Sequence, residues 1–169
     1  MGFAGWRDYD PALSGAHHAL IDLPDGAHVW DAPPTELARA FDREAYRVQV
    51  AGAVQKHLKN MPVQAVAFPA VLGLEAPGEV VADLAARIGL PVFELPTLPP
   101  SVPGTRLFNR MRRYLLDNRA RVQIGHPVVR GLIENGRAAG VEVAAVGKPE
   151  TFRAKAVILA TGGLYGGGL

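Results

Sequence analysis

Cysteine is absent from this chain of 169 residues. Without cysteine the chain has no disulfide framework, no thiolate metal site, no iron–sulfur cluster of its own and no cysteine nucleophile. The five histidines show no metal-binding spacing with carboxylates; they are His17, His18, His28, His57 and His126. The sequence therefore predicts no metal site.

An excess of charge of one sign is also missing. The formal net charge is +2, from 18 basic and 16 acidic residues. No stretch combines basic clusters with stacking aromatic residues, so we expect no nucleic-acid partner. No apolar run approaches the roughly 20 residues that a membrane-spanning helix needs, so we expect no direct membrane span.

Several motifs that carry chemistry are missing as well. The chain shows no Ser-His-Asp arrangement, no phosphate-binding P-loop and no paired acid and base carboxylates, and hydrolase or kinase activity has no motif behind it. A Gly-x-Gly-x-x-Gly motif, typical of the first turn of a dinucleotide-binding fold, is not found near the start. No residue is assigned a catalytic role.

Strand and helix patterns alternate along most of the chain. This alternation predicts an α/β fold with a mostly parallel sheet, flanking helices and a C-terminal β-hairpin. We expect one amphipathic helix over 36–59, capped by Thr35 and with Val48 on its apolar face. A strand over 63–72, a short helix around 80–88 that Gly89 ends, and a strand over 92–95 should follow. Short elements are also expected over 1–6, 11–20 and 27–30.

A proline-rich segment over 96–103 predicts a rigid loop, because four prolines in eight residues remove donors and fix φ. A helix with an apolar face over 107–115 follows. Ser101, Thr105 and Arg106 stand where this helix begins, and a helix N-terminus can bind a phosphate. They are candidate ligands of a substrate phosphate. In the alternative interpretation Ser101 or Thr105 caps the helix and Arg106 faces solvent.

The last third predicts a different structure. Strands are expected over 121–124 and 127–134, and Asn135-Gly136 is a strong signal for a two-residue hairpin that returns over 137–146. Residues 151–155 then lead into an apolar run, 156–160, that predicts a strand buried on both faces.

The sequence Ala160-Thr161-Gly162-Gly163 follows this run. Glycines admit a dinucleotide close to the backbone and expose N–H groups to its phosphates. The alternative is a simple exit from strand to loop that needs a positive φ.

The strand followed by Ala-Thr-Gly-Gly resembles flavoproteins of the fumarate reductase and succinate dehydrogenase superfamily. Two stretches, 95–107 and 162–169, look like the B subunit of the anaerobic glycerol-3-phosphate dehydrogenases, and 68–74 and 2–8 are also similar. The resemblance implies a central fragment of such a flavoprotein. Its partial flavin-binding domain would occupy 99–169, and an inserted, cap-like α/β lobe would occupy 1–98.

The same resemblance implies a flavin, FAD or FMN, in the intact parent. The residues that would face it are Val128, Ala160, Thr161, Gly162 and Gly163. We expect this chain alone to bind no flavin and to be inactive. In the parent, a catalytic A subunit would oxidise glycerol 3-phosphate to dihydroxyacetone phosphate, and a membrane-associated iron–sulfur subunit would pass electrons toward quinone.

We accordingly expect a cytoplasmic location, peripheral at the inner face of the cell membrane through partner subunits. Two alternatives remain open. In the first, the chain is a fragment of another flavoprotein related to fumarate reductase. In the second, it is a non-catalytic interaction module whose proline loop docks a partner.

Overall fold

The computed structural model describes residues 15–21, 33–97 and 100–163. The chain divides into two compact units, Met1–Arg113 and Tyr114–Leu169. This division falls within helix α5 (Val102–Asp117), whereas the boundary expected from the sequence, between 98 and 99, precedes that helix. The elements expected over 1–6 and 27–30 lie outside the described residues, and the described part of the third, 15–20, contains no helix.

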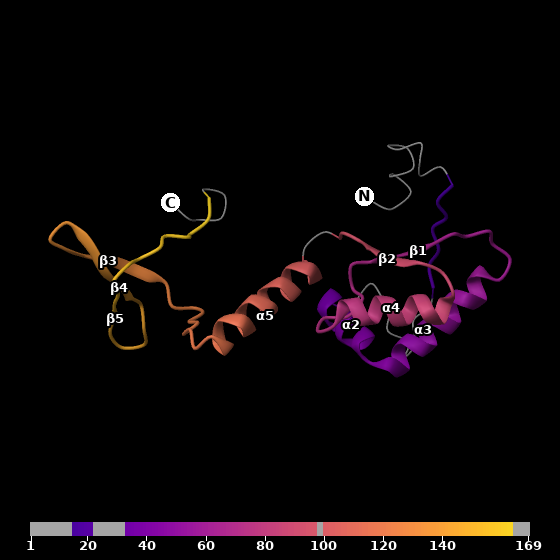
Figure 1. The fold of residues 1–169 in the computed structure, drawn as a ribbon, viewed down its shortest axis with the longest axis horizontal. Coiled ribbons are helices and arrows are strands. Elements are labelled where there is room, and N and C mark those ends of the chain that lie inside the picture. The colour runs from indigo at the N-terminus through magenta and orange to yellow at the C-terminus, as the bar shows by residue number, and fades with distance from the viewer. Residues whose placement is uncertain (1–14, 22–32, 98–99, 164–169) are drawn as a thin grey trace. The chain divides into compact units, whose positions relative to one another are not determined.

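The first unit is built on a parallel pair of strands. Strand β1 (Val66–Pro69) pairs with β2 (Val92–Leu95), with Val66 opposite Val92. Helix α4 (Pro77–Ile88) connects them and ends at Gly89, whose φ of 81° is left-handed. Helices α2, α3 and α4 gather on one face of the pair (Figure 1). The predicted α/β class, the helix that Gly89 ends and the strand over 92–95 are therefore confirmed.

The single helix predicted over 36–59 is two helices, α2 (Pro34–Asp42) and α3 (Glu44–Leu58). The helix begins at Pro34, so Thr35 is not its cap. The break lies at Arg43, which has an extended backbone with φ −85° and ψ 124°. Arg47 stabilises the break, because its guanidinium donates to the carbonyls of Phe41 and Asp42, both at 3.0 Å.

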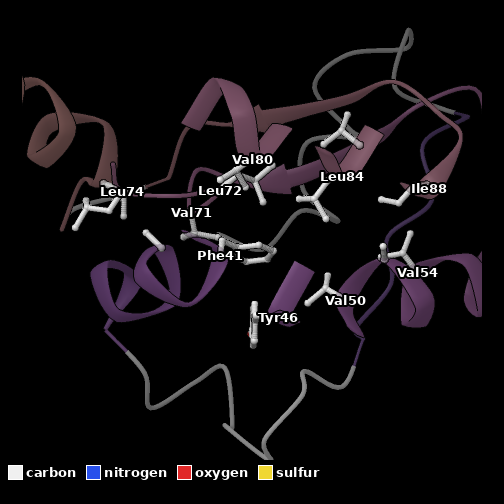
Figure 2. Close-up of a cluster of buried hydrophobic side chains, with 14 residues drawn as sticks. Phe41, Tyr46, Val50, Val54, Val71, Leu72, Leu74, Val80, Leu84 and Ile88 are labelled. Carbon is white, nitrogen blue, oxygen red and sulfur yellow. The ribbon is translucent and has the colours of Figure 1, made fainter. Parts of the chain in front are cut away.

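This break changes which side chains reach the core. The rings of Phe41 and Tyr46 meet edge to face, with their centroids 5.1 Å apart, whereas Val48, which continuous helical spacing placed on the buried face, is 47% exposed. Figure 2 shows the resulting cluster, to which α2, α3, α4 and the loop after β1 all contribute. Its most completely buried large members are Phe41, Leu72 and Leu84.

The strand predicted over 63–72 ends early, at Pro69. The five residues that follow, 70–74, are all buried without being part of a strand or helix. Their backbone is satisfied by tight turns and by a side chain. The N–H of Gly73 donates to the carbonyl of Val71 at 2.9 Å, and the Asp42 carboxylate accepts from the N–H of Leu74 at 3.0 Å. Buried backbone groups need such partners.

Gly73 should be irreplaceable in this buried loop. Its φ is +81°, and an added Cβ would lie 2.7 Å from Cγ2 of Val80 and 2.9 Å from Oδ1 of Asp42. We predict that Gly73→Ala lowers the free energy of unfolding by about 2–4 kcal/mol, since backbone strain and overpacking add. Urea denaturation measures this loss. The control is Gly78→Ala in α4, where a Cβ meets nothing within 4 Å; an equal loss in both variants would contradict the prediction.

Helices α3 and α4 are joined by a chain of charged groups. The Asp83 carboxylate accepts from Arg47 and, at 2.8 Å, from Arg87. Arg87 also donates to Glu44 at 2.7 Å. The hydrogen bonds from Arg87 and then Arg47 lower the pKa of Asp83 below its ordinary value. The contact between Arg47 of α3 and Asp83 of α4 thus has its full strength only while Asp83 is ionised.

Lowering the pH should weaken the hydrogen bonds that Asp83 accepts. Because the pKa of Asp83 is lower in the folded state, its contribution is present above the unfolded pKa of about 3.9 and is lost as the pH falls through the folded value. We predict that Asp83→Asn flattens the fall in unfolding free energy below about pH 5. Urea denaturation across pH measures this slope. Asp117→Asn, at an exposed carboxylate of α5, serves as control, and an unchanged slope in Asp83→Asn would refute the role.

The second unit contains a three-stranded antiparallel sheet in the order β3-β4-β5. Its strands are β3 (Val128–Glu134), β4 (Arg137–Val143) and β5 (Glu150–Arg153). Asn135 and Gly136 join the first two with φ of 51° and 74°, as a type I′ turn requires. The predicted hairpin is confirmed. Gly140 allows β5 to approach, because a Cβ there would lie 2.2 Å from the carbonyl oxygen of Phe152.

Two strands predicted in this unit are not formed. Residues 121–124 have no regular structure. Residues 156–160, expected to be a strand buried on both faces, also lie outside any strand and are exposed, Ile158 by 89%. A strand of that kind needs neighbours on both sides, and no described strand pairs with this segment. After β5 the chain runs on as an extended segment (Figure 1).

Candidate functional site

The first candidate site lies at the start of helix α5. The helix begins at Val102, so the rigid loop predicted over 96–103 extends two residues too far. Pro103 fits the first turn of the helix, because the N–H groups there have no partner within the helix and proline lacks an N–H. Ser101 caps the helix, because its Oγ accepts from the N–H of Gly104 at 3.1 Å. The Thr105 hydroxyl donates to the carbonyl of Ser101, also at 3.1 Å.

Arg106 is held by three hydrogen bonds. Its Nη1 and Nη2 donate to the two carboxylate oxygens of Glu94 at 2.6 and 2.8 Å, and its Nε donates to the carbonyl of Gly73 at 2.7 Å. The two side chains are only 14% and 19% exposed. Glu94 also accepts from the N–H of Leu72 at 2.6 Å. Arg106 therefore does not face solvent.

The structure thus brings the three predicted phosphate ligands to one helix turn, at the carboxyl ends of β1 and β2. It also gives each of them a partner within the chain: Ser101 and Thr105 act in the first turn, and Arg106 joins α5 to Glu94 and to the buried loop. A role in binding a substrate phosphate stays a prediction.

Sequence reasoning missed Asp42 and Glu94, the two carboxylates that bind the buried loop. Glu94 carried a usable signal, because it is an acidic residue within the short apolar strand Val92–Leu95. An acidic residue there needs a charged partner. Asp42 carried none, since within the amphipathic helix predicted over 36–59 it looks like an ordinary solvated residue.

Replacing Arg106 tests its structural role. A lysine keeps the charge but loses the two-pronged contact with Glu94 and the bond to Gly73. We predict that Arg106→Lys lowers the free energy of unfolding by about 1–3 kcal/mol. Arg112→Lys, at an exposed position of the same helix, should change it by less than about 0.5 kcal/mol. If both variants unfold at the same urea concentration as the unaltered chain, the bridge contributes nothing.

The second candidate site consists of the five residues predicted to face a flavin. Val128 begins β3, opposite Val143, and is exposed. Residues 160–163 lie outside regular structure and are exposed. Gly162 has a φ of +81°, and an added Cβ at Gly162 or Gly163 would meet nothing within 4 Å. The backbone there is open to a ligand, as both the flavin interpretation and a simple loop exit require.

One cavity among the described residues is much smaller than a flavin site. It has a volume of about 90 Å³ and is lined by Arg43, Ala45, Tyr46 and Gln49. Small-molecule sites usually enclose about 300–1,000 Å³. Among the described residues there is also no group of three or more histidine or acidic side chains that could hold a metal ion. None of the described helices has both the length and the apolar character needed to cross a membrane.

Comparison with known proteins connects the second unit to flavin binding. Residues 102–166 match the family described as FAD binding domain. The chain is 40% identical over 104 residues to the B subunit of a probable anaerobic glycerol-3-phosphate dehydrogenase of Halobacterium salinarum, covering 62% of this chain and 24% of that protein. The chain is thus similar to a B subunit of this kind. The resemblance noted in the sequence is therefore confirmed.

Two further relatives, both B subunits of anaerobic glycerol-3-phosphate dehydrogenases, cover more of the chain. The one from Pectobacterium carotovorum is 33% identical over 136 residues, which are 79% of this chain and 30% of that protein. The one from Yersinia pestis is 29% identical over 182 residues, covering 100% of this chain and 42% of that protein. The chain thus spans about a quarter to two fifths of the relatives it matches. No solved structure matches it.

Proposed function

We propose that this chain is a structural part of a flavin-dependent oxidoreductase, of the kind formed by these B subunits, acting in quinone-linked oxidation of glycerol 3-phosphate to dihydroxyacetone phosphate. One observation carries the proposal. The match to the FAD binding domain family, residues 102–166, includes α5, the antiparallel sheet and the exposed glycines. Relatives named as B subunits match both units of the chain. The names of these relatives favour this function over that of another fumarate-reductase-like flavoprotein.

The residues proposed to hold the flavin act through their backbone. Gly162 and Gly163 leave the main chain uncovered, so that their N–H groups can donate to the phosphate or ribityl oxygens of the cofactor. Val128 would present strand backbone to the adenine ring. A bound flavin supplies the two-electron acceptor that oxidation of an alcohol to a ketone requires. The family description supports FAD over FMN.

The partners proposed for the parent are a catalytic A subunit plus a membrane-associated iron–sulfur subunit. The relatives' designation as B subunits supports association with further subunits. We propose a cytoplasmic location, with contact to the inner face of the membrane only through these partners. The chain alone supplies one side of the flavin site, and we propose that it is inactive by itself.

A pair of glycine variants tests the flavin site. Gly162 and Gly125 have nearly equal φ, 81° and 79°, and a Cβ at either meets nothing within 4 Å. Valine therefore strains both positions alike. In the complete gene product containing this chain, we predict that Gly162→Val weakens FAD binding by roughly tenfold or more, about 1.4 kcal/mol. Gly125→Val should bind FAD as the unaltered protein does. Visible absorbance of the purified protein and titration with FAD measure the difference.

Two results would refute the proposal. In the first, the complete gene product purifies colourless and takes up neither FAD nor FMN. In the second, both valine variants bind FAD equally well. Oxidation of glycerol 3-phosphate is measured separately, with the catalytic partner present and an artificial electron acceptor. The first result would rule out the flavin role. A flavin-loaded complex that does not oxidise glycerol 3-phosphate would rule out only the proposed substrate.

A further inference from the structure

Helix α5 presents its apolar side to solvent. Five of its apolar residues recur at the spacing of one helix face, and these five are between 41% and 68% exposed. We call these five residues the α5 stripe: Leu107, Phe108, Met111, Tyr114 and Leu115. Among the helix's residues only Val102 is buried. An exposed apolar face of this kind marks an interaction surface.

The opposite side of the helix is the one that is attached. At about 100° per residue, Val102, Arg106 and Arg113 fall in the sector opposite the stripe. Val102 joins the core of the first unit, Arg106 binds Glu94 and Gly73, and Arg113 donates to Glu75 at 2.9 Å. A surface helix normally packs its apolar face inward and leaves its charges in water. Helix α5 does the reverse, so its apolar face is available to another surface.

The charges around the stripe fit a lipid surface as well as a protein surface. An amphipathic helix lying on an anionic membrane has arginines beside its apolar face to reach the headgroups. In α5, Arg106 and Arg113 are on the far side and engaged with carboxylates, whereas Arg110 and Arg112 border the stripe. The stripe itself carries no charge, like the interior face of a packed helix.

The comparisons favour a protein surface and indicate which protein supplies it. The match to the FAD binding domain family begins at residue 102 and contains all of α5. The relatives have more than half of their length outside the stretch that matches this chain. We propose that the α5 stripe is the surface on which the remainder of the flavin domain of such a dehydrogenase packs, whether supplied by the same polypeptide or by another. This inference rests on the proposed function.

Reassembly from two pieces tests the inference. The probe is the part of the Yersinia pestis relative that lies outside its match to this chain, carrying an affinity tag and mixed with the chain in the absence of flavin. We expect the probe to capture the chain. Met111→Asp and Phe108→Asp should each weaken capture roughly tenfold or more. Val48→Asp places the same charge at an exposed position of α3 and should have no effect. Circular dichroism checks that each variant keeps its helices.

The alternative occupant gives a distinct result. If the chain floats with phosphatidylglycerol vesicles, and Met111→Asp abolishes flotation but leaves capture unchanged, the stripe is a lipid-binding surface and the inference is overturned. Equal capture of all the variants overturns it as well. Because the assay contains no flavin, a complex that forms but stays colourless in added FAD contradicts the proposed function and leaves the α5 inference standing.

A second measurement does not depend on reassembly. In the full-length Yersinia pestis relative without other cysteines, a cysteine is placed at the position aligned with Met111 or at that aligned with Val48. We expect maleimide to label the first at least roughly tenfold more slowly, since packing would cover it. Equal rates would show that the stripe is open in the complete protein and would overturn the inference, whatever the outcome of capture.

Discussion

The fold of the first unit depends on satisfying the backbone of a buried loop. Residues 70–74 follow β1 into the core without strand or helix bonds of their own. Two carboxylates and one guanidinium supply what regular structure does not: Asp42 and Glu94 accept from loop N–H groups, and Arg106 donates to a loop carbonyl. An unpartnered buried backbone group costs about 1–3 kcal/mol. These few polar contacts therefore allow the apolar side chains of the loop to remain in the core.

The same contacts explain the unusual orientation of α5. Glu94 binds the buried loop with one oxygen while both oxygens receive Arg106. The polar side of α5 is thus attached to the first unit by charge and geometry, and only Val102 adds apolar burial. Its apolar side consequently points away. Fixing a helix by its polar side makes sense where the apolar side has a second surface to meet, which links the ion pair at Arg106 to the proposed packing of the α5 stripe.

Prediction from sequence succeeded where one local signal decided the structure. Gly89 ends α4 because only glycine adopts its left-handed conformation without strain, and Asn135-Gly136 forms a turn for the same reason. Prediction failed where contacts between residues far apart in the sequence decided the structure. The break at Arg43 depends on Arg47, whose side chain turns back to the carbonyls of α2 and reaches Asp83 on α4. Helical periodicity contains nothing about such a contact, and it placed Val48 in the core.

The segment 156–160 shows the same limit most clearly. Its branched apolar residues favour a buried strand, yet Ile158 and Leu159 are exposed and unpaired with any described strand. Strand propensity measures how well a side chain fits a pleated, covered surface, and that surface belongs to neighbouring strands. The glycines after it pose the same problem, because an open backbone binds a dinucleotide only when other walls hold the ligand against it. In the proposed function, residues 156–163 and the α5 stripe thus have the same requirement, a flavin domain surface that the described residues do not themselves provide.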